Sequence, residues 1–252
     1  MISSGCKCFL RFVVVHMIFC VFNKEEEIML KRALKKFAEY CNAFMVDGAK
    51  FVGKYDIPEC PSTATSLPTH LIAYSDIKRN KLSTGFAHFY IDDYKFDTRR
   101  GGIWNKPETA LKKLRQCQGV ITPDFSTYQE MPASMKIYNT YRMRAFGLWL
   151  TKQGIPVINN VRWGTPETYA YCFDGIPQNS IVSIGTVGCI KEKNNWQRFR
   201  EGLAEMIKRL CPSTIIVYGS APDKFFGKYR ETGLPIIEYP SRMQMFFEEF
   251  VR

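Results

Sequence analysis

The spacing of apolar positions changes near residue 70 and divides the chain into two regions. Residues 29–46 place apolar side chains at helical spacing, which predicts a helix. Residues 53–69 are rich in proline, serine and threonine, a composition typical of a loop. From residue 69 to 252, short apolar runs alternate with amphipathic ones. We therefore expect one α/β domain over 69–252, preceded by a helix and a proline-rich loop over 29–68.

Several short runs rich in β-branched and aromatic residues are the strand candidates. The later runs, such as 214–218, are apolar without alternation, as expected for strands that are covered on both faces. The predicted strands are 71–74, 86–91, 119–122, 156–160, 181–185, 214–218 and 235–239.

Helical patterns lie between these runs, over 107–117, 136–152 and 196–210, and a last one covers 242–251. Strands that alternate with helices through short connections form parallel sheets. The fold class is therefore α/β, with a predominantly parallel sheet of about six or seven strands. The sheet is either TIM-barrel-like, complete or partial, or doubly wound.

The first 28 residues carry an apolar run from residue 9 to 22 that is interrupted by Arg11 and His16. This run is shorter than the roughly 20 residues that a membrane span needs, and no small-residue cleavage site follows it. Residues 24–27 can be encoded by a purine-rich bacterial ribosome-binding sequence, and Met29 follows at a suitable spacing. We expect translation to start at Met29 and residues 1–28 to be a translated leader, with a signal or anchor segment as the alternative.

The chain carries 35 Lys and Arg against 24 Asp and Glu, a formal net charge of +11. This charge favours anionic partners, but it is dispersed, which also fits an ordinary solvated surface. The 9 cysteines include no C-x-x-C pair, so reduced thiols of a cytoplasmic protein are the simplest interpretation. With 3 histidines, metal sites built on several histidines are excluded. An all-carboxylate Mg²⁺ site using Asp92, Asp93 or Asp124 stays open, and the cofactor is unknown.

Polar residues follow the predicted strands, at the edge where parallel α/β folds bind ligands. Asp124 follows the run 119–122 and Glu238 lies at the end of the last run. Two carboxylates in one cleft can act as general acid and general base, so these are the candidate catalytic residues. The candidate substrate-binding residues are Tyr138, Arg142, Asn160, Arg162, Trp163, Thr186, Gly219 and Ser220.

Each of these positions also has a structural interpretation. Asp, Asn, Ser and Gly are ordinary turn residues and helix caps. Arg142 lies on a helix beside Tyr138 and Tyr141, where it could hold a phosphate or carboxylate or pair with a structural acid. Trp163 at a strand end is expected to pack or to stack on a planar ligand.

The same residues carry a family resemblance. The motifs are Pro123-Asp124-Phe125-Ser126-x-Tyr128, Tyr138-Asn139-x-x-Arg142-x-Arg144-x-x-Gly147 and Val157-Ile158-x-Asn160-x-Arg162-Trp163-Gly164. Over about residues 55–240 the chain resembles the domain of unknown function 4417 family of bacteria, phages and other mobile elements. The resemblance implies a cytoplasmic, phage or mobile-element setting, and it carries over no catalytic assignment.

The favoured interpretation is an enzyme or ligand-binding protein that acts on an anionic substrate, such as a nucleotide, a nucleobase or nucleic acid. One alternative is a non-catalytic basic module that binds nucleic acid or protein, because the charge alone would support it. Another is a glycosidase-like hydrolase, which needs the carboxyl groups of Asp124 and Glu238 about 5–5.5 Å or 6.5–9.5 Å apart. The oligomeric state stays open.

Overall fold

A computed structural model describes residues 25–26, 28–29, 32, 42–78, 81–190 and 192–250. The chain forms two compact units, residues 1–47 and 48–252. The start of translation at Met29 stays a prediction, and the predicted leader, apart from residues 25, 26 and 28, falls outside the described residues. So does most of the predicted helix 29–46, whose last four residues form the short 3-10 helix η1 (Ala43–Val46).

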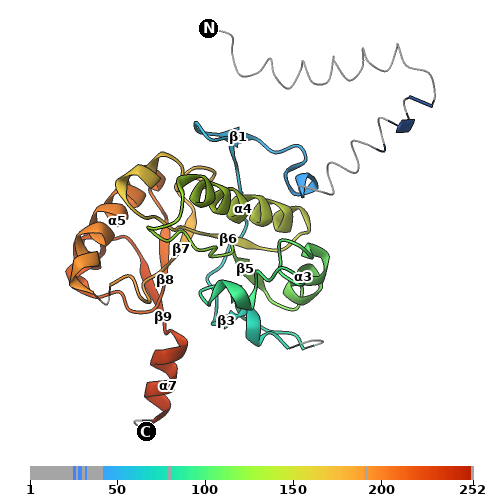
Figure 1. The fold of residues 1–252 in the computed structure, drawn as a ribbon. Helices are drawn as coiled ribbons and strands as arrows, with labels where there is room; N and C mark the ends of the chain where they lie inside the picture. The colour runs from blue at the N-terminus through green and yellow to red at the C-terminus, as the bar shows by residue number, and fades with distance from the viewer. Residues whose placement is uncertain are drawn as a thin grey trace. The chain divides into compact units, whose positions relative to one another are not determined.

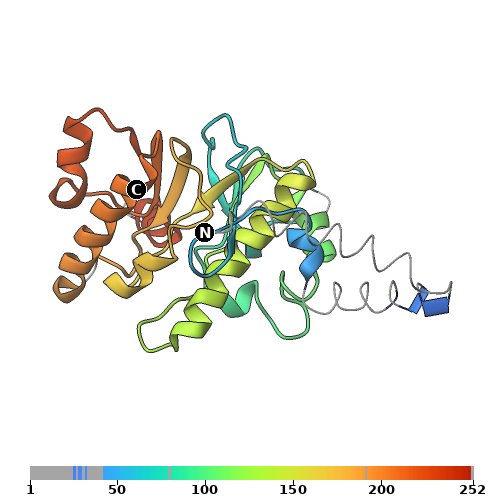
Figure 2. The same cartoon turned by 90° about the horizontal axis from the view of Figure 1, so that it is seen from above.

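Residues 48–252 are built on a sheet of seven parallel strands that follow one another in chain order. The sheet curls into a half-barrel (Figures 1 and 2). A doubly wound sheet would reverse its strand order at one point; this one does not, so the partial-barrel prediction is confirmed and the doubly wound one is wrong. The strands are β3 (Leu71–Ala73), β4 (Phe86–His88), β5 (Gly119–Ile121), β6 (Val157–Asn160), β7 (Ile181–Gly185), β8 (Thr214–Tyr218) and β9 (Ile236–Tyr239).

The helices follow the predicted alternation. Pro107 occupies the first turn of α3, where its missing N–H costs nothing. Gly154, with a φ of +76°, follows the end of α4 in the left-handed conformation typical of helix ends. The helices are α3 (Pro107–Leu114), α4 (Ala133–Lys152), α5 (Trp196–Leu210), α6 (Asp223–Glu231) and α7 (Arg242–Phe250). Among the α-helices of the described residues, α6 alone was not expected, because it is short, highly charged and interrupted by Gly227.

The compact unit begins at Gly48 rather than at residue 69, because the proline-rich segment is part of it. This segment contains a two-stranded hairpin of β1 (Phe51–Val52) and β2 (Ile57–Pro58), too short to leave a sequence pattern. Farther along, the Thr63 amide donates to the Val157 carbonyl at 3.0 Å, and the Cys60 amide donates to Gly175 at 2.8 Å. The loop is therefore bonded to the N-terminal end of β6 and to the turn after η4 (Pro166–Ala170).

Alternation along each strand divides the core into two faces. On β8, Ile215 and Val217 pack outward with residues of α5 and α6, among them Phe199 and Phe226. Ile216 faces inward with the second apolar cluster, which includes Phe86, Ile121, Ile158 and Tyr239. Both faces are apolar, which explains why the strands read as continuous apolar runs.

An aromatic stack crosses the inner face near the C-terminal ends of the strands. The ring of Tyr218 lies 4.5 Å from His88 and 5.0 Å from Tyr90, with the two tyrosines nearly parallel. The Tyr90 amide donates to Nδ1 of His88 at 3.1 Å. Burial lowers the pKa of His88 to about 4, so this imidazole is neutral in the folded protein near neutral pH.

Arg144 of α4 is fully buried and joins the helix to two other segments. Its guanidinium donates to the carbonyls of Asn160, Cys172 and Asp174, at 3.1, 3.0 and 3.1 Å. Burial lowers its pKa to about 10, which keeps it charged at neutral pH. The end of β6 and the turn over residues 172–174 are therefore fixed to α4 by one side chain.

Within the part of the chain that the structure describes, no helix is both long enough and apolar enough to cross a membrane.

Replacing Arg144 with Met should destabilise the protein by about 3–5 kcal/mol, because three buried carbonyls lose their donor. Arg144→Lys keeps the charge but has fewer donors, so its free energy of unfolding should lie between those of Arg144→Met and the wild type. Urea unfolding measures both. The control is Arg115→Met at an exposed arginine that has only a 3.4 Å bond to Gln153, with an expected change below about 1 kcal/mol. Equal stability of Arg144→Met and the wild type would contradict the assigned role.

The depressed pKa of His88 should make stability depend on pH. The unfolded chain binds a proton near the ordinary pKa of 6.5, whereas the folded chain binds it only near 4. Stability is therefore complete above this window and is lost as the pH falls, by about 2 kcal/mol between about pH 7 and about pH 5. His88→Asn keeps an acceptor for the Tyr90 amide and should remove this part of the pH dependence, whereas His70→Asn, at an exposed histidine, should not. An unchanged pH dependence in His88→Asn would refute this assignment.

Candidate functional site

A pocket of about 490 Å³ opens at the C-terminal ends of the central strands. Its size falls in the range of small-ligand sites in proteins. The lining comes from the segments that follow four adjacent strands, together with parts of α4, α5 and β8. These are residues 90–93 after β4, 124 and 126–129 after β5, 160–165 from the end of β6, 185 and 187–189 from the end of β7, and Lys136, Asn195, Arg198, Phe199 and Tyr218.

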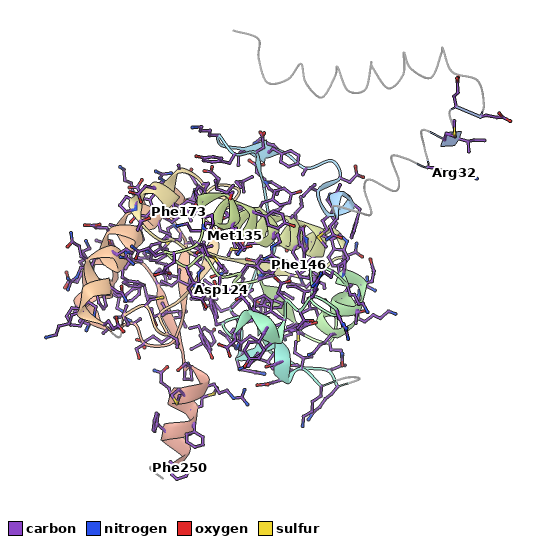
Figure 3. The ribbon with its side chains drawn as sticks, in the orientation of Figure 1. Arg32, Asp124, Met135, Phe146, Phe173 and Phe250 are labelled. Atoms are coloured by element: carbon purple, nitrogen blue, oxygen red, sulfur yellow. The ribbon has the colours of Figure 1, made fainter. Side chains whose placement is uncertain are left out.

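Asp124 lies in the wall of this pocket, near the middle of the unit in Figure 3. Its Oδ2 accepts from Arg162 at 2.6 Å, and its Oδ1 accepts from Nδ2 of Asn160 at 2.8 Å. Burial raises the pKa of Asp124, and the charge of Arg162 and the bond from Asn160 only partly offset the effect. Asp124 thus releases its proton at a higher pH than an exposed aspartate does.

Asn160 is held at every hydrogen-bonding group. Its backbone N–H donates to Oγ1 of Thr122 at 2.8 Å, and its backbone carbonyl accepts from Arg144. Its side-chain oxygen accepts from the Tyr90 hydroxyl at 3.0 Å. With the oxygen occupied in this way, the side-chain nitrogen is turned toward Asp124, so the fold fixes the direction of the Asn160 amide.

Tyr90 and Tyr218 form an aromatic wall of the pocket. The Tyr90 hydroxyl also lies 2.8 Å from Oγ of Ser183 on β7. A Cβ at Gly185 would come within 2.9 Å of the Tyr90 ring, so a glycine is required where this ring crosses the end of β7. Burial and the nearby charge of Asp124 raise the pKa of Tyr90, which keeps this hydroxyl protonated.

Trp163 lines the pocket but is also part of the core. Its ring packs 5.5 Å from Phe199 and 6.4 Å from Phe173. A Cβ at Gly202 would overlap the indole, so the glycine lets the ring lie directly on the backbone of α5. Trp163 is therefore a rigid, partly buried wall of the pocket.

A second carboxylate, Asp93, enters the pocket from the segment after β4. It accepts from the amide and the hydroxyl of Ser126, at 3.1 and 2.8 Å. The neighbouring Asp92 is paired with Lys95 at 2.9 Å. Among the described residues no group of three or more His, Cys, Asp or Glu side chains is placed to hold a metal ion.

Three basic side chains line the pocket, and they differ in their hydrogen-bond and ion-pair partners. Arg162 is paired with Asp124 and also donates to Thr127 at 3.2 Å. Lys136 donates to the carbonyl of Gln129 at 3.1 Å. Arg198 has no hydrogen bond or ion pair with the described part of the chain.

Arg142 and Tyr138 lie outside the pocket lining. Arg142 is paired with Asp97 at 2.7 Å and stacks 3.9 Å from the ring centre of Phe125. Tyr138 is exposed and lies parallel to Tyr141 on the same helix. Of the two interpretations of Arg142, pairing with a structural acid fits the structure, because Asp97 already pairs with its charge.

Glu238 also lies away from the pocket. It pairs in register with Val217, whose side chain packs on the outer face of the sheet. Its carboxylate accepts from Arg230 of α6 at 3.1 Å. Asp124 lines the pocket and Glu238 does not, so the geometry offers no basis for a paired-carboxylate hydrolase.

Thr186, Gly219 and Ser220 connect the ends of β7 and β8 beside the pocket. The buried Thr186 hydroxyl donates to the Ser220 carbonyl at 2.8 Å. Gly219, with a φ of +106°, packs over Thr186, and the Ser220 hydroxyl accepts from Gln244 at 2.9 Å. None of the three lines the pocket, so their visible role is to hold the two strand ends together.

Four predicted site residues therefore meet in the pocket: Asp124, Asn160, Arg162 and Trp163. Tyr90, Lys136, Arg198 and Tyr218 also line the pocket but were not predicted, and Asp93 was predicted only as a possible Mg²⁺ ligand. Tyr90 and Tyr218 could have been found from strand parity, since both occupy inward positions near strand ends. Lys136 and Arg198 lie on helices and left no signal in the sequence.

Comparison with known proteins places this site within one family. The model of the family described as "Domain of unknown function (DUF4417)" matches residues 49–240. The chain is 36% identical over 168 residues to each "Gene 1 protein" of Mycobacterium phages D29 and L5. The match covers 66% of this chain, 60% of the D29 protein and 71% of the L5 protein.

No solved structure matches the chain. The family match spans the hairpin, the whole half-barrel sheet and every residue of the pocket. The chain is thus similar to gene 1 proteins of two mycobacteriophages, and it belongs to the family of the domain of unknown function DUF4417.

Proposed function

We propose that the pocket binds a small anionic ligand of the nucleotide or nucleobase class, and that Asp124 is its acid–base group. The observation that carries the proposal is the Asp124–Arg162 pair, held by Asn160 in the wall of a 490 Å³ pocket at the strand ends. The five free cysteines among the described residues support a reducing, cytoplasmic setting.

The shape and chemistry of the lining suit a flat, polar ligand. Tyr90, Tyr218 and Trp163 supply rigid aromatic surface, on which a heterocyclic ring can pack. Asn160, Ser126 and Thr127 add groups that can bond to the edge of such a ring. Pockets with an apolar wall and a few oriented polar groups are the usual form of small-molecule sites.

Asp124 suits proton transfer because of how it is held. Both of its oxygens accept hydrogen bonds, yet burial still raises its pKa. A carboxylate with a raised pKa can accept and return a proton nearer neutral pH, which general acid–base catalysis requires. Arg162 would then stabilise the charged form between the two transfers.

A second candidate function is binding of nucleic acid at the surface, without a reaction. Nζ of Lys224 lies 3.6 Å from the ring centre of Trp196, and the guanidinium of Arg200 lies 5.1 Å from that of Phe225. Phe225 is buried, so Trp196 is the ring of this cluster on which a base of a single strand could stack, with Lys224 and Arg200 beside the backbone. This cluster lies on α5 and α6, and Lys224, Trp196 and Arg200 do not line the pocket.

Thermal unfolding of the full chain, freed of nucleic acid, should separate the two functions. The probes are nucleobases, nucleosides, nucleotides, sugar phosphates and single-stranded DNA. A ligand at 100 times its Kd stabilises the folded state by about 2.7 kcal/mol, which is readily measured. We expect a small-molecule probe to do this, and Asp124→Asn to reduce the effect by at least half. Chromatography of the same ligand should show conversion that Asp124→Asn slows by about 10²-fold or more.

Glu238→Gln is the matched control, since it neutralises the other predicted carboxylate outside the pocket. It should leave the stabilisation by ligand unchanged. It should lower the free energy of unfolding by less than about 1 kcal/mol, because the bond between Glu238 and Arg230 is exposed. Stabilisation by single-stranded DNA alone, abolished by salt and indifferent to Asp124→Asn, would favour the surface-binding function. An equal response of both variants to a small ligand would remove Asp124 from the site.

A further inference from the structure

The charges around the pocket are distributed unevenly. Asp93 and Asp124 come from the segments after β4 and β5, whereas Arg198 lies on α5, which follows β7. In the sheet order, β4 and β7 are three strand positions apart, about 14 Å along the sheet. The acidic groups and Arg198 therefore lie on different sides of the pocket, with the segment after β6 between them.

Arg198 differs from the other arginines near the pocket. The guanidinium of Arg142 is paired with Asp97, that of Arg144 is bonded to three carbonyls, and that of Arg162 is paired with Asp124. Arg198 is half-buried and lines the pocket, yet it has no such partner among the described residues. Glu201, one turn along α5, accepts instead from Gln197 at 2.8 Å.

Lys136 adds a second positive charge to the pocket from the first turns of α4. Its ammonium donates to a carbonyl and forms no ion pair with a carboxylate among the described residues; the acid that its charge acts on is Glu167 of η4. Asp92 and Asp124 are neutralised by Lys95 and Arg162, which leaves Asp93 as the unpaired acid of the pocket. The lining thus has one acid without a basic partner, Asp93, and two cations without a carboxylate partner, Arg198 and Lys136.

We propose that Arg198, assisted by Lys136, binds the phosphate of a nucleoside monophosphate whose ring packs against the aromatic wall. A guanidinium offers several donors in the planar arrangement that suits phosphate oxygens, and the ammonium acts as a point charge beside it. Asp93 on the opposite side accepts a hydrogen bond from the uncharged part of the ligand. The ligand is then a nucleotide rather than a free base or nucleoside.

This inference rests on the proposed function, because it names the charged end of the ligand in the same pocket. It has a distinct consequence, since the phosphate should matter only through Arg198 and Lys136. Loss of a charge-assisted contact of this kind corresponds to roughly a tenfold to hundredfold change in Kd. A nucleoside lacks the phosphate and should be indifferent to both side chains.

Isothermal titration calorimetry on the full chain tests this with matched pairs of probes, the four common nucleosides and their 5′-monophosphates. The wild type should bind at least one monophosphate about tenfold or more tightly than its nucleoside. Arg198→Met should reduce the affinity for that monophosphate to the level of the nucleoside and leave the nucleoside unchanged, and Lys136→Met should have a smaller effect of the same kind. The control is Lys208→Met on the same helix, because Lys208 is exposed and does not line the pocket. Arg200→Met probes the surface cluster near Phe225.

Each outcome decides one claim. Equal weakening of nucleoside and monophosphate by Arg198→Met would show that Arg198 shapes the pocket without binding phosphate. Equal affinity of the wild type for both probes, with no effect of Arg198→Met, would overturn the phosphate site and leave the proposed function standing. Absence of binding by every probe would overturn the proposed function and this inference together. Weakening by Arg200→Met as large as by Arg198→Met would move the phosphate to the surface of α5.

Discussion

The buried guanidinium of Arg144 is the constraint on which the site depends. A charge of this kind is tolerated in a protein interior only where its donors are matched by acceptors. Three carbonyls supply them, and one belongs to Asn160. Because α4, the end of β6 and the turn after η4 must meet around this one side chain, the position of Asn160 is set by the core.

The side-chain contacts of Asn160 extend this constraint to the residues of the pocket. Its side-chain oxygen is held by Tyr90 and its nitrogen points to Asp124, which in turn holds Arg162. The chain of contacts runs from a fully buried arginine to a carboxylate at the edge of a cavity. Such support by packed and bonded neighbours is what keeps a catalytic or binding group in one geometry. The half-barrel places this chain at the strand ends, where parallel sheets commonly bind ligands.

The sequence predicted the bounds of an element correctly where its residues all indicated the same secondary structure. The bounds of β7, β8 and α5 were predicted without error, because β7 and β8 are short, mainly apolar runs and α5 shows one clear amphipathic face. The strand-end rule predicted that Asp124, Asn160, Arg162 and Trp163 lie close together, and all four line the pocket, because the carboxyl ends of parallel strands meet at one edge of a sheet. The rule was misleading at Glu238, because it predicts at which end of a strand a residue lies but not on which face of the sheet. Side chains alternate along a strand, so the inward Ile237 already implies that Glu238 points outward. Arg142 was ambiguous because its partner, Asp97, lies 45 residues away in the sequence.

A crystal structure of the full chain soaked with a nucleoside 5′-monophosphate tests the central claim most directly. The account predicts density for one ligand in the pocket, with its ring against Tyr90 or Trp163 and its phosphate within hydrogen-bond distance of Arg198. Density at the Trp196 surface of α5 and α6, with none in the pocket, would contradict it.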